Sequence, residues 1–222
     1  MGWAGEFIVA SPTSPLMAFK GGNMRRKELE VKDQKSLKEV LDKAEIGYLA
    51  FNGPDGWPRV TPLNFIFDGR ILWHGAVGGE RFECLKRDPR ATFMAVSLQR
   101  YIPSHFISES AANASVAFKS VSARGRCMIV EDPEERCAIL NKLMDKYQPE
   151  GKYVPLTPEN PLYTKVLKGT GVFAFSPEEI TGKFKLLNGK SEADRRAIAA
   201  KLREAGTPLD TLVAAEILKS IA

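Results

Sequence analysis

Residues that could bind a phosphate group gather in one short stretch, between His74 and Arg81. Gly78 and Gly79 stand directly before a helix-like run that starts at Glu80. Glycines before a helix let backbone N–H groups converge, and the positive end of the helix dipole favours an anion there. Arg81 lies in the first predicted turn, where its guanidinium could hold a phosphate with two hydrogen bonds. The stretch is a candidate phosphate site, although ordinary strand-to-helix turns share this pattern.

The residues before this site predict a β-hairpin that positions it. Residues 60–67 are rich in β-branched and aromatic side chains, and Asp68-Gly69 tolerates the positive φ of a two-residue hairpin turn. Residues 70–74 form the returning strand, so His74 ends the strand that leads to the glycines. A histidine at a strand end is also often only a half-buried polar residue. The helix after the glycines should end before Asp88-Pro89.

The remaining pattern predicts a mainly β protein with peripheral helices. Further strands are expected at 46–51, 91–98, 114–130, 170–175 and 179–187, and helices at 36–44, 132–147, 161–168, 191–205 and from 207 onward. Residues 99–113 are expected to be a loop. Gly125 interrupts the longest strand and is expected to form a bulge, which a small barrel needs in order to close. Six or seven strands joined by turns predict a small antiparallel barrel.

Composition is that of an ordinary globular protein. The chain has 222 residues, of which 44% are hydrophobic and 27% charged, with a net charge of +5. We expect a single domain over residues 24–222, which includes C-terminal helices, preceded by a flexible tail over residues 1–23. The basic residues form no stripe with aromatic residues, so we do not expect nucleic-acid binding. No apolar run approaches the ~20 residues needed to span a bilayer, so we expect no membrane insertion.

The three cysteines show no C-x-x-C spacing, and the first residues lack the basic start of a signal peptide. Free thiols in a reducing compartment are therefore expected, which predicts a cytoplasmic location. With only two histidines and no cysteine cluster, we expect no metal site.

Several short motifs occur in a fixed order from about residue 24 to 203. They are Met24-Arg25-Arg26-Lys27, then Val60, Pro62, Leu63 and Phe65, then His74 with Arg81, then Ser120-Val121 with Gly125, and finally Thr181-Gly182-Lys183. In this order the chain resembles the FMN-binding split-barrel proteins related to pyridoxamine 5'-phosphate oxidase, especially the nitroimidazole-resistance branch. That family usually has lysine at the position of Arg81, so the sequence departs from the pattern but keeps the charge.

The resemblance implies an α+β, mainly β fold, a six- or seven-stranded antiparallel Greek-key barrel, assembled as a homodimer with FMN at the subunit interface. It also implies the site. Thr61, Pro62, Leu63 and the adjacent Asn64 would face the flavin ring, and His74, Gly75 and Ala76 would flank the phosphate and ribityl chain. Arg81 would neutralise the phosphate, Ser120 would offer a hydroxyl from the facing strand, and Lys183 would reach the flavin of the partner subunit.

The implied function is an FMN-dependent oxidoreductase that reduces a small electrophile such as a nitroaromatic compound. His74 would act beside the substrate, either as a neutral hydrogen-bond donor or as a proton donor. The electron donor is unknown, because the sequence has no G-x-G-x-x-G fingerprint for a nicotinamide domain.

Two alternatives stay open. The first is a non-catalytic flavin- or haem-binding protein, for which His74 and His105 are the candidate haem ligands. The second is a true pyridoxamine-phosphate oxidase. We rank it last, because the chain ends in a predicted helix instead of a second set of basic residues for a substrate phosphate.

Overall fold

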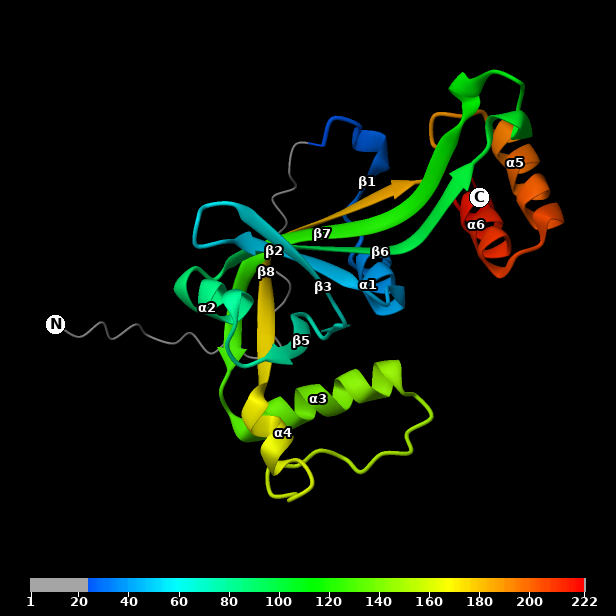
Figure 1. Cartoon of the computed structure of the whole chain (residues 1–222). Helices are drawn as coiled ribbons and strands as arrows, with labels where there is room; N and C mark the ends of the chain where they lie inside the picture. Colours follow the sequence, from blue (N-terminus) through cyan, green and yellow to red (C-terminus); the bar gives the residue numbers. More distant parts are fainter. Residues whose placement is uncertain (1–23, 222) are drawn as a thin grey trace.

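The computed structural model of the chain describes residues 24–221 and contains one antiparallel sheet (Figure 1). Its strand order is β3-β2-β6-β7-β8-β5-β4, and β1 pairs with β8 outside this path. The strands are β1 (Glu30–Val31), β2 (Gly47–Asn52), β3 (Pro58–Leu63), β4 (Ile66–Phe67), β5 (Ile71–Ala76), β6 (Arg90–Ile102), β7 (Ser115–Val130) and β8 (Thr170–Lys185). Since β1 and β4 have only two residues each, six strands build most of the sheet. The predicted α+β, mainly β architecture is confirmed.

The sheet is forced to roll up by one short connection. β3 and β4 are at opposite ends of the strand order, yet only Asn64 and Phe65 lie between them. Three steps of chain span at most about 11 Å, so the two edges of the sheet must approach one another. The prediction of one strand over residues 60–67 is therefore wrong. The strand breaks because the chain leaves one edge after Leu63 and joins the other at Ile66, while Phe65 is buried in the core.

The end of a helix satisfies the backbone at this crossing. The Phe65 N–H donates to Tyr147 Oη at 2.9 Å, and Lys146 Nζ donates to the carbonyl oxygens of Phe65 at 3.0 Å and Ala44 at 2.9 Å. Lys146 Nζ also lies 4.2 Å from the centroid of the Phe65 ring. Burial lowers the pKa of Lys146, whose three donors point at carbonyl oxygens. These contacts hold the two sheet edges in place without ladder hydrogen bonds.

Strands β6 and β8 are longer than their sequence pattern suggests. β6 continues to Ile102, followed by the short 3-10 helices η2 (Ser104–Phe106) and η3 (Ala111–Asn113), so the loop predicted over 99–113 begins too early. The strands predicted at 170–175 and 179–187 form one strand, β8. It continues past Pro177 because this residue pairs with Gly125, where the β7–β8 register shifts. The irregularity predicted at Gly125 is present, but the extra residue is Glu178 of β8, so β8 and not β7 carries the bulge, and Pro177 is tolerated beside it.

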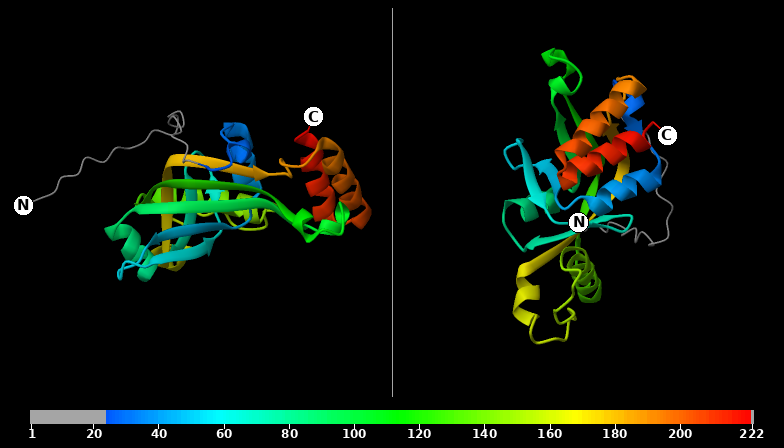
Figure 2. Two further views of the ribbon diagram at one scale, coloured as in Figure 1. Left: turned by 90° about the horizontal axis from the view of Figure 1, so that it is seen from above. Right: turned by 90° about the vertical axis from the view of Figure 1, so that its right-hand side faces the viewer.

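Helices cover the barrel and extend one end of it. They are α1 (Gln34–Lys43), α2 (Glu80–Arg87), α3 (Pro133–Tyr147), α4 (Thr164–Gly169), α5 (Glu192–Ala205) and α6 (Pro208–Lys219), preceded by the short 3-10 helix η1 (Lys27–Leu29). Figures 1 and 2 show α5 and α6 at the far ends of β6 and β7, away from α3 and α4. No helix within residues 24–221 is long and apolar enough to cross a membrane.

Most apolar side chains of α6 are covered by its own chain, while Leu209 and Leu212 stay exposed. Val213 and Ile217 are fully buried in a cluster that also contains Leu98 and Ile102 of β6. Two ion pairs fix the position of this helix, Lys119 Nζ to Glu216 Oε2 at 2.5 Å and Arg100 Nε to Asp210 Oδ1 at 2.5 Å. The barrel has its own core, in which Trp73 stacks on Phe173 with ring centroids 5.3 Å apart.

The bulge gives a stability prediction. A Cβ atom at Gly125 would lie 2.0 Å from the Ser176 carbonyl oxygen, which belongs to backbone and cannot rotate away. We expect Gly125→Ala to lower the free energy of unfolding by about 2 kcal/mol or more, measured by urea denaturation. Gly169→Ala is the control, since nothing lies within 4 Å of its Cβ position. Equal stability of both variants would contradict the role of Gly125.

Candidate phosphate corner at the split of the sheet

The predicted glycine corner is present between β5 and α2. Gly78 and Gly79 have φ values of +90° and +82°, a region that only glycine enters without strain. Gly79 is the N-cap of α2, and no side chain caps the helix there. The N–H groups of the first turn of α2 are therefore available to an external acceptor.

Arg81 folds back from the first turn of α2 onto the end of β5. A Cβ atom at Gly75 would lie 1.9 Å from Arg81 Nη2, so only glycine leaves room for this guanidinium. Its Cζ atom lies 5.9 Å from the centroid of the Phe173 ring. The side chain is half-buried, and within residues 24–221 no carboxylate forms an ion pair with it. Burial lowers the pKa of Arg81, so an anion at this point would relieve the cost of burying its charge.

Arg59 is a residue of this corner that the sequence analysis missed. Its Nε atom lies 3.0 Å from Glu80 Oε1, and its Nη2 atom lies 3.0 Å from Asp55 Oδ2. Arg59 is thus already balanced by two acids, whereas Arg81 has none in the described chain. The ion pair with Glu80 ties the edge strand β3 to the start of α2. Alternation along β3 could have revealed Arg59, since it shares a strand face with Thr61.

The residues predicted to face a flavin ring lie on the edge strand β3 and at the start of its crossing to β4. Thr61, Pro62 and Leu63 end β3, and Asn64 begins the crossing to β4. Only one side of β3 pairs in the sheet, which explains why Pro62 is tolerated. The Arg59–Glu80 contact and the short crossing bring this edge near the corner. The Arg59–Glu80 ion pair is the contact that joins β3 to the corner.

His74 lies on β5 just before Gly75 and pairs with Val172 of β8. The residue is exposed at the surface. Partial desolvation lowers the pKa of His74, and the nearby Arg81 charge lowers it further. The imidazole is therefore neutral at neutral pH and can donate one hydrogen bond or accept one. Ala76 follows on the same strand and is exposed.

Ser120 and Lys183 form a separate pair that the structure does not bring to the corner. They are Cα partners in the β7–β8 ladder, and the buried Ser120 Oγ donates to the Lys183 carbonyl oxygen at 3.4 Å. From Val172, the partner of His74, to Lys183 the strand path of β8 is roughly 35 Å. If Ser120 and Lys183 contact a ligand held by Arg81, that ligand must be bound to a second copy of the chain. His105 lies in η2, beyond the far end of β6, so it cannot join His74 on one haem within a single copy.

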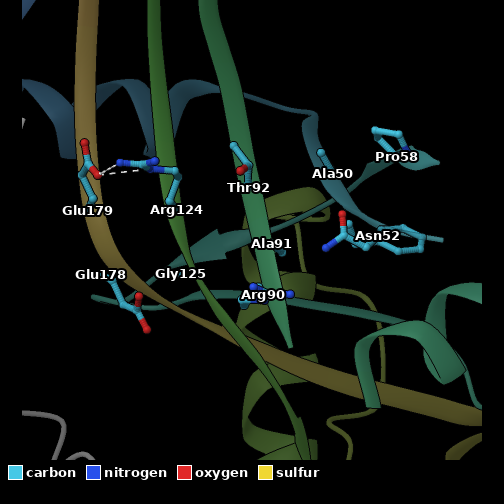
Figure 3. A pocket seen from close by; sticks show the side chains of 11 residues that line it. Ala50, Asn52, Pro58, Arg90, Ala91, Thr92, Arg124, Gly125, Glu178 and Glu179 are labelled. Atoms are coloured by element: carbon cyan, nitrogen blue, oxygen red, sulfur yellow. Dashed lines mark hydrogen bonds and ion pairs between the residues drawn. The ribbon is translucent and has the colours of Figure 1, made fainter. Parts of the chain in front are cut away.

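The outer face of the barrel carries a broad groove of about 690 Å³, which no motif in the sequence indicates (Figure 3). Its floor comes from β2, β6 and β7, and both of its glutamates are paired, Glu179 with Arg124 in the groove and Glu178 with Arg126 beside it. Three apolar side chains are exposed on the same face, Tyr48, Val60 and Met94. No group of three metal-ligating side chains occurs in the part of the chain that the structure describes.

Comparison with known proteins adds to this geometry. A family model described as pyridoxamine 5'-phosphate oxidase matches residues 33–184, so helices α5 and α6 lie beyond the match. No curated protein matches the chain in a sequence search.

Solved structures share the fold. The flavocytochrome Anf3 from Azotobacter vinelandii is 27% identical with a TM-score of 0.62, covering 77% of this chain and 76% of that one. An FAD and haem binding protein from Mycobacterium smegmatis is 20% identical with a TM-score of 0.60, covering 70% and 73%. A proposed 5-nitroimidazole antibiotic resistance protein from Bacteroides thetaiotaomicron is 20% identical with a TM-score of 0.57, covering 69% and 85%. The predicted split-barrel fold is confirmed.

The charge of Arg81 near His74 predicts a shifted pH titration. We expect the pKa of His74 to lie below its ordinary 6.5, so the ring becomes charged only as the pH falls below that value. Arg81→Met should raise this pKa but leave it below 6.5, because desolvation is the larger cause. NMR titration of labelled histidine measures it, and His105→Gln assigns the two signals. An unchanged His74 pKa in Arg81→Met would contradict the arrangement.

Proposed function

This chain belongs to the pyridoxamine 5'-phosphate oxidase family, and on that premise we propose that it is an FMN-binding oxidoreductase that reduces a small electrophile. The observation that carries the proposal is the half-buried Arg81 guanidinium, which lacks an acid partner in the described chain and lies against Gly75 beside the start of α2. A phosphate monoester fits this arrangement, since it would receive hydrogen bonds from both the guanidinium and the free N–H groups of the helix.

The roles of the other residues follow from their places around the split. The backbone from Thr61 to Asn64 would supply hydrogen bonds to a flavin ring along the unpaired edge of β3. Gly75 and Ala76 would leave space for the ribityl chain. His74 would orient the substrate as a neutral hydrogen-bond donor, in agreement with its lowered pKa. Bound FMN would supply the electron transfer itself, and the protein would position it.

Substrate class and electron donor are the finer parts of the proposal. The chain shares its fold with a proposed 5-nitroimidazole resistance protein. That shared fold is the basis on which we propose a nitroaromatic substrate. The donor would be an external reduced nicotinamide or a partner protein that binds transiently. We place the reaction in the cytoplasm, in keeping with three free cysteines that are all buried.

Flavin retention tests the proposal. Wild-type protein should keep FMN through a desalting column and show flavin absorption bands that a reductant bleaches and a nitroaromatic acceptor restores. Arg81→Ala should weaken FMN binding by roughly ten- to hundredfold, because a charge-assisted hydrogen bond contributes about 1.5–3 kcal/mol. Arg87→Ala, at the other end of α2, is the matched control and should bind FMN normally. A colourless wild-type protein that takes up no flavin would overturn the proposal.

A second candidate is a haem-binding, non-catalytic role. It is favoured by the 27% identity to a flavocytochrome, whose name indicates haem as well as flavin. In this chain His74 would have to act as the single histidine ligand, since His105 lies far away. A Soret band that His74→Ala removes would support this role, whereas a flavin spectrum with acceptor turnover would exclude it.

We also propose a homodimer that uses the outer face of the barrel. Its exposed Tyr48, Val60 and Met94, and its arginine–glutamate pairs, suit an isologous interface, because such a surface must complement itself. The same contact would let Lys183 of one copy approach the flavin of the other.

Met94→Lys should convert the dimer to a monomer, since it places a charge in the apolar part of this face. Sedimentation velocity measures the change. Val154→Lys is the control, because Val154 is similarly exposed on a loop away from the sheet. Wild-type protein that sediments as a monomer at all concentrations would contradict the interface.

A further inference from the structure

A small cavity of about 220 Å³ lies directly beside the phosphate corner, between α2, α3 and α4. It has apolar walls and a charged rim. The walls include Val77, Phe82 and Ile129, and the rim includes Glu131, Arg136 and Lys168. A complete small-molecule site occupies about 300–1,000 Å³, so this cavity is too small to hold such a ligand alone. Its volume suits one part of a ligand whose remainder is bound at a neighbouring site.

The cavity and the corner share their walls. Phe82 follows Arg81 on α2, and both side chains lie against the Phe173 ring, Phe82 with its centroid 6.1 Å away. Gly171 in the cavity wall is the Cα partner of Gly75, over which the Arg81 guanidinium lies. The connecting Gly78 and Gly79 have nothing within 4 Å of their Cβ positions. No atom of the described chain fills the space directly above these two glycines.

The rim carries an excess of positive charge. Arg136 Nη2 donates to the carbonyl oxygens of Leu167 at 2.5 Å and Thr170 at 2.7 Å, which fixes the guanidinium in place. Neither Arg136 nor Lys168 forms an ion pair within residues 24–221, and Glu131 is the one acid among the lining residues. Together with Arg81, the two cations extend the positive region of the corner into the cavity.

We propose that this cavity binds the adenosine phosphate half of a dinucleotide. Its phosphate would lie against Arg136 and Lys168, and its adenosine against the apolar walls. The inference rests on the proposed flavin site for the half held at Arg81. Two ligands have this chemistry, FAD as the resident cofactor and a reduced nicotinamide dinucleotide as the electron donor.

Lys168→Glu tests the proposal, because Lys168 is exposed and makes no hydrogen bond or ion pair in the described chain. Lys165→Glu is the control, with the same charge change on α4 but outside the cavity. Titrations of both variants and of wild type would use FMN, FAD, NADH and ADP as probes. We expect Lys168→Glu to weaken ADP binding roughly fivefold or more and to leave FMN binding unchanged.

The flavin and nicotinamide titrations identify the source of the dinucleotide. If FAD binds wild type more tightly than FMN and Lys168→Glu removes the difference, the cavity serves the cofactor. If FAD and FMN bind alike and only NADH binding weakens, the cavity serves the donor. Equal affinity of Lys168→Glu and wild type for FAD, NADH and ADP would overturn the inference. ADP binding that Lys168→Glu weakens, in a protein that takes no flavin, would overturn the proposed function and leave the cavity assignment standing.

Discussion

The chain crosses between the two edges of its sheet in only two residues, Asn64 and Phe65, and the rest of the architecture depends on this crossing. Such a short link compels the sheet to curl until its edges meet, but it leaves the Phe65 backbone without a ladder partner. Buried backbone groups need hydrogen-bond partners, and the end of α3 provides them through Lys146 and Tyr147. A helix more than eighty residues away in sequence thus completes the closure.

The candidate site draws on elements that this closure brings toward one another. β3 contributes an unpaired backbone edge, β5 contributes His74 and Gly75, and α2 contributes its N-terminus and Arg81. The arginines of the corner differ in how their charges are balanced, because Arg59 has two acid partners and Arg81 has none in the described chain. This contrast explains why Arg81, and not the equally basic Arg59, is the better candidate for an anion.

The sequence predicted most features that depend on neighbouring residues. The glycine corner and the helix starts predicted at residues 132 and 191 are local, and the structure contains each of them to within one residue. Features that depend on distant pairing were missed. The break after Leu63, the continuation of β8 past Pro177 and the Arg59–Glu80 ion pair all arise from strand order. The separation of Ser120 from His74 is likewise a matter of register, which residue types alone do not reveal.

The two prolines of β3 have a consequence for the protein's solubility. An edge strand offers unpaired N–H and C=O groups to any other strand it meets, and this makes it a starting point for aggregation. Pro58 and Pro62 are four residues apart, so both lack their N–H on the same side of the strand. Because the ladder with β2 is complete across them, that side is the open one. A strand from another molecule that approaches this edge finds no N–H donor for two of its carbonyl oxygens. The edge can therefore stay accessible to a ligand without pairing with another chain.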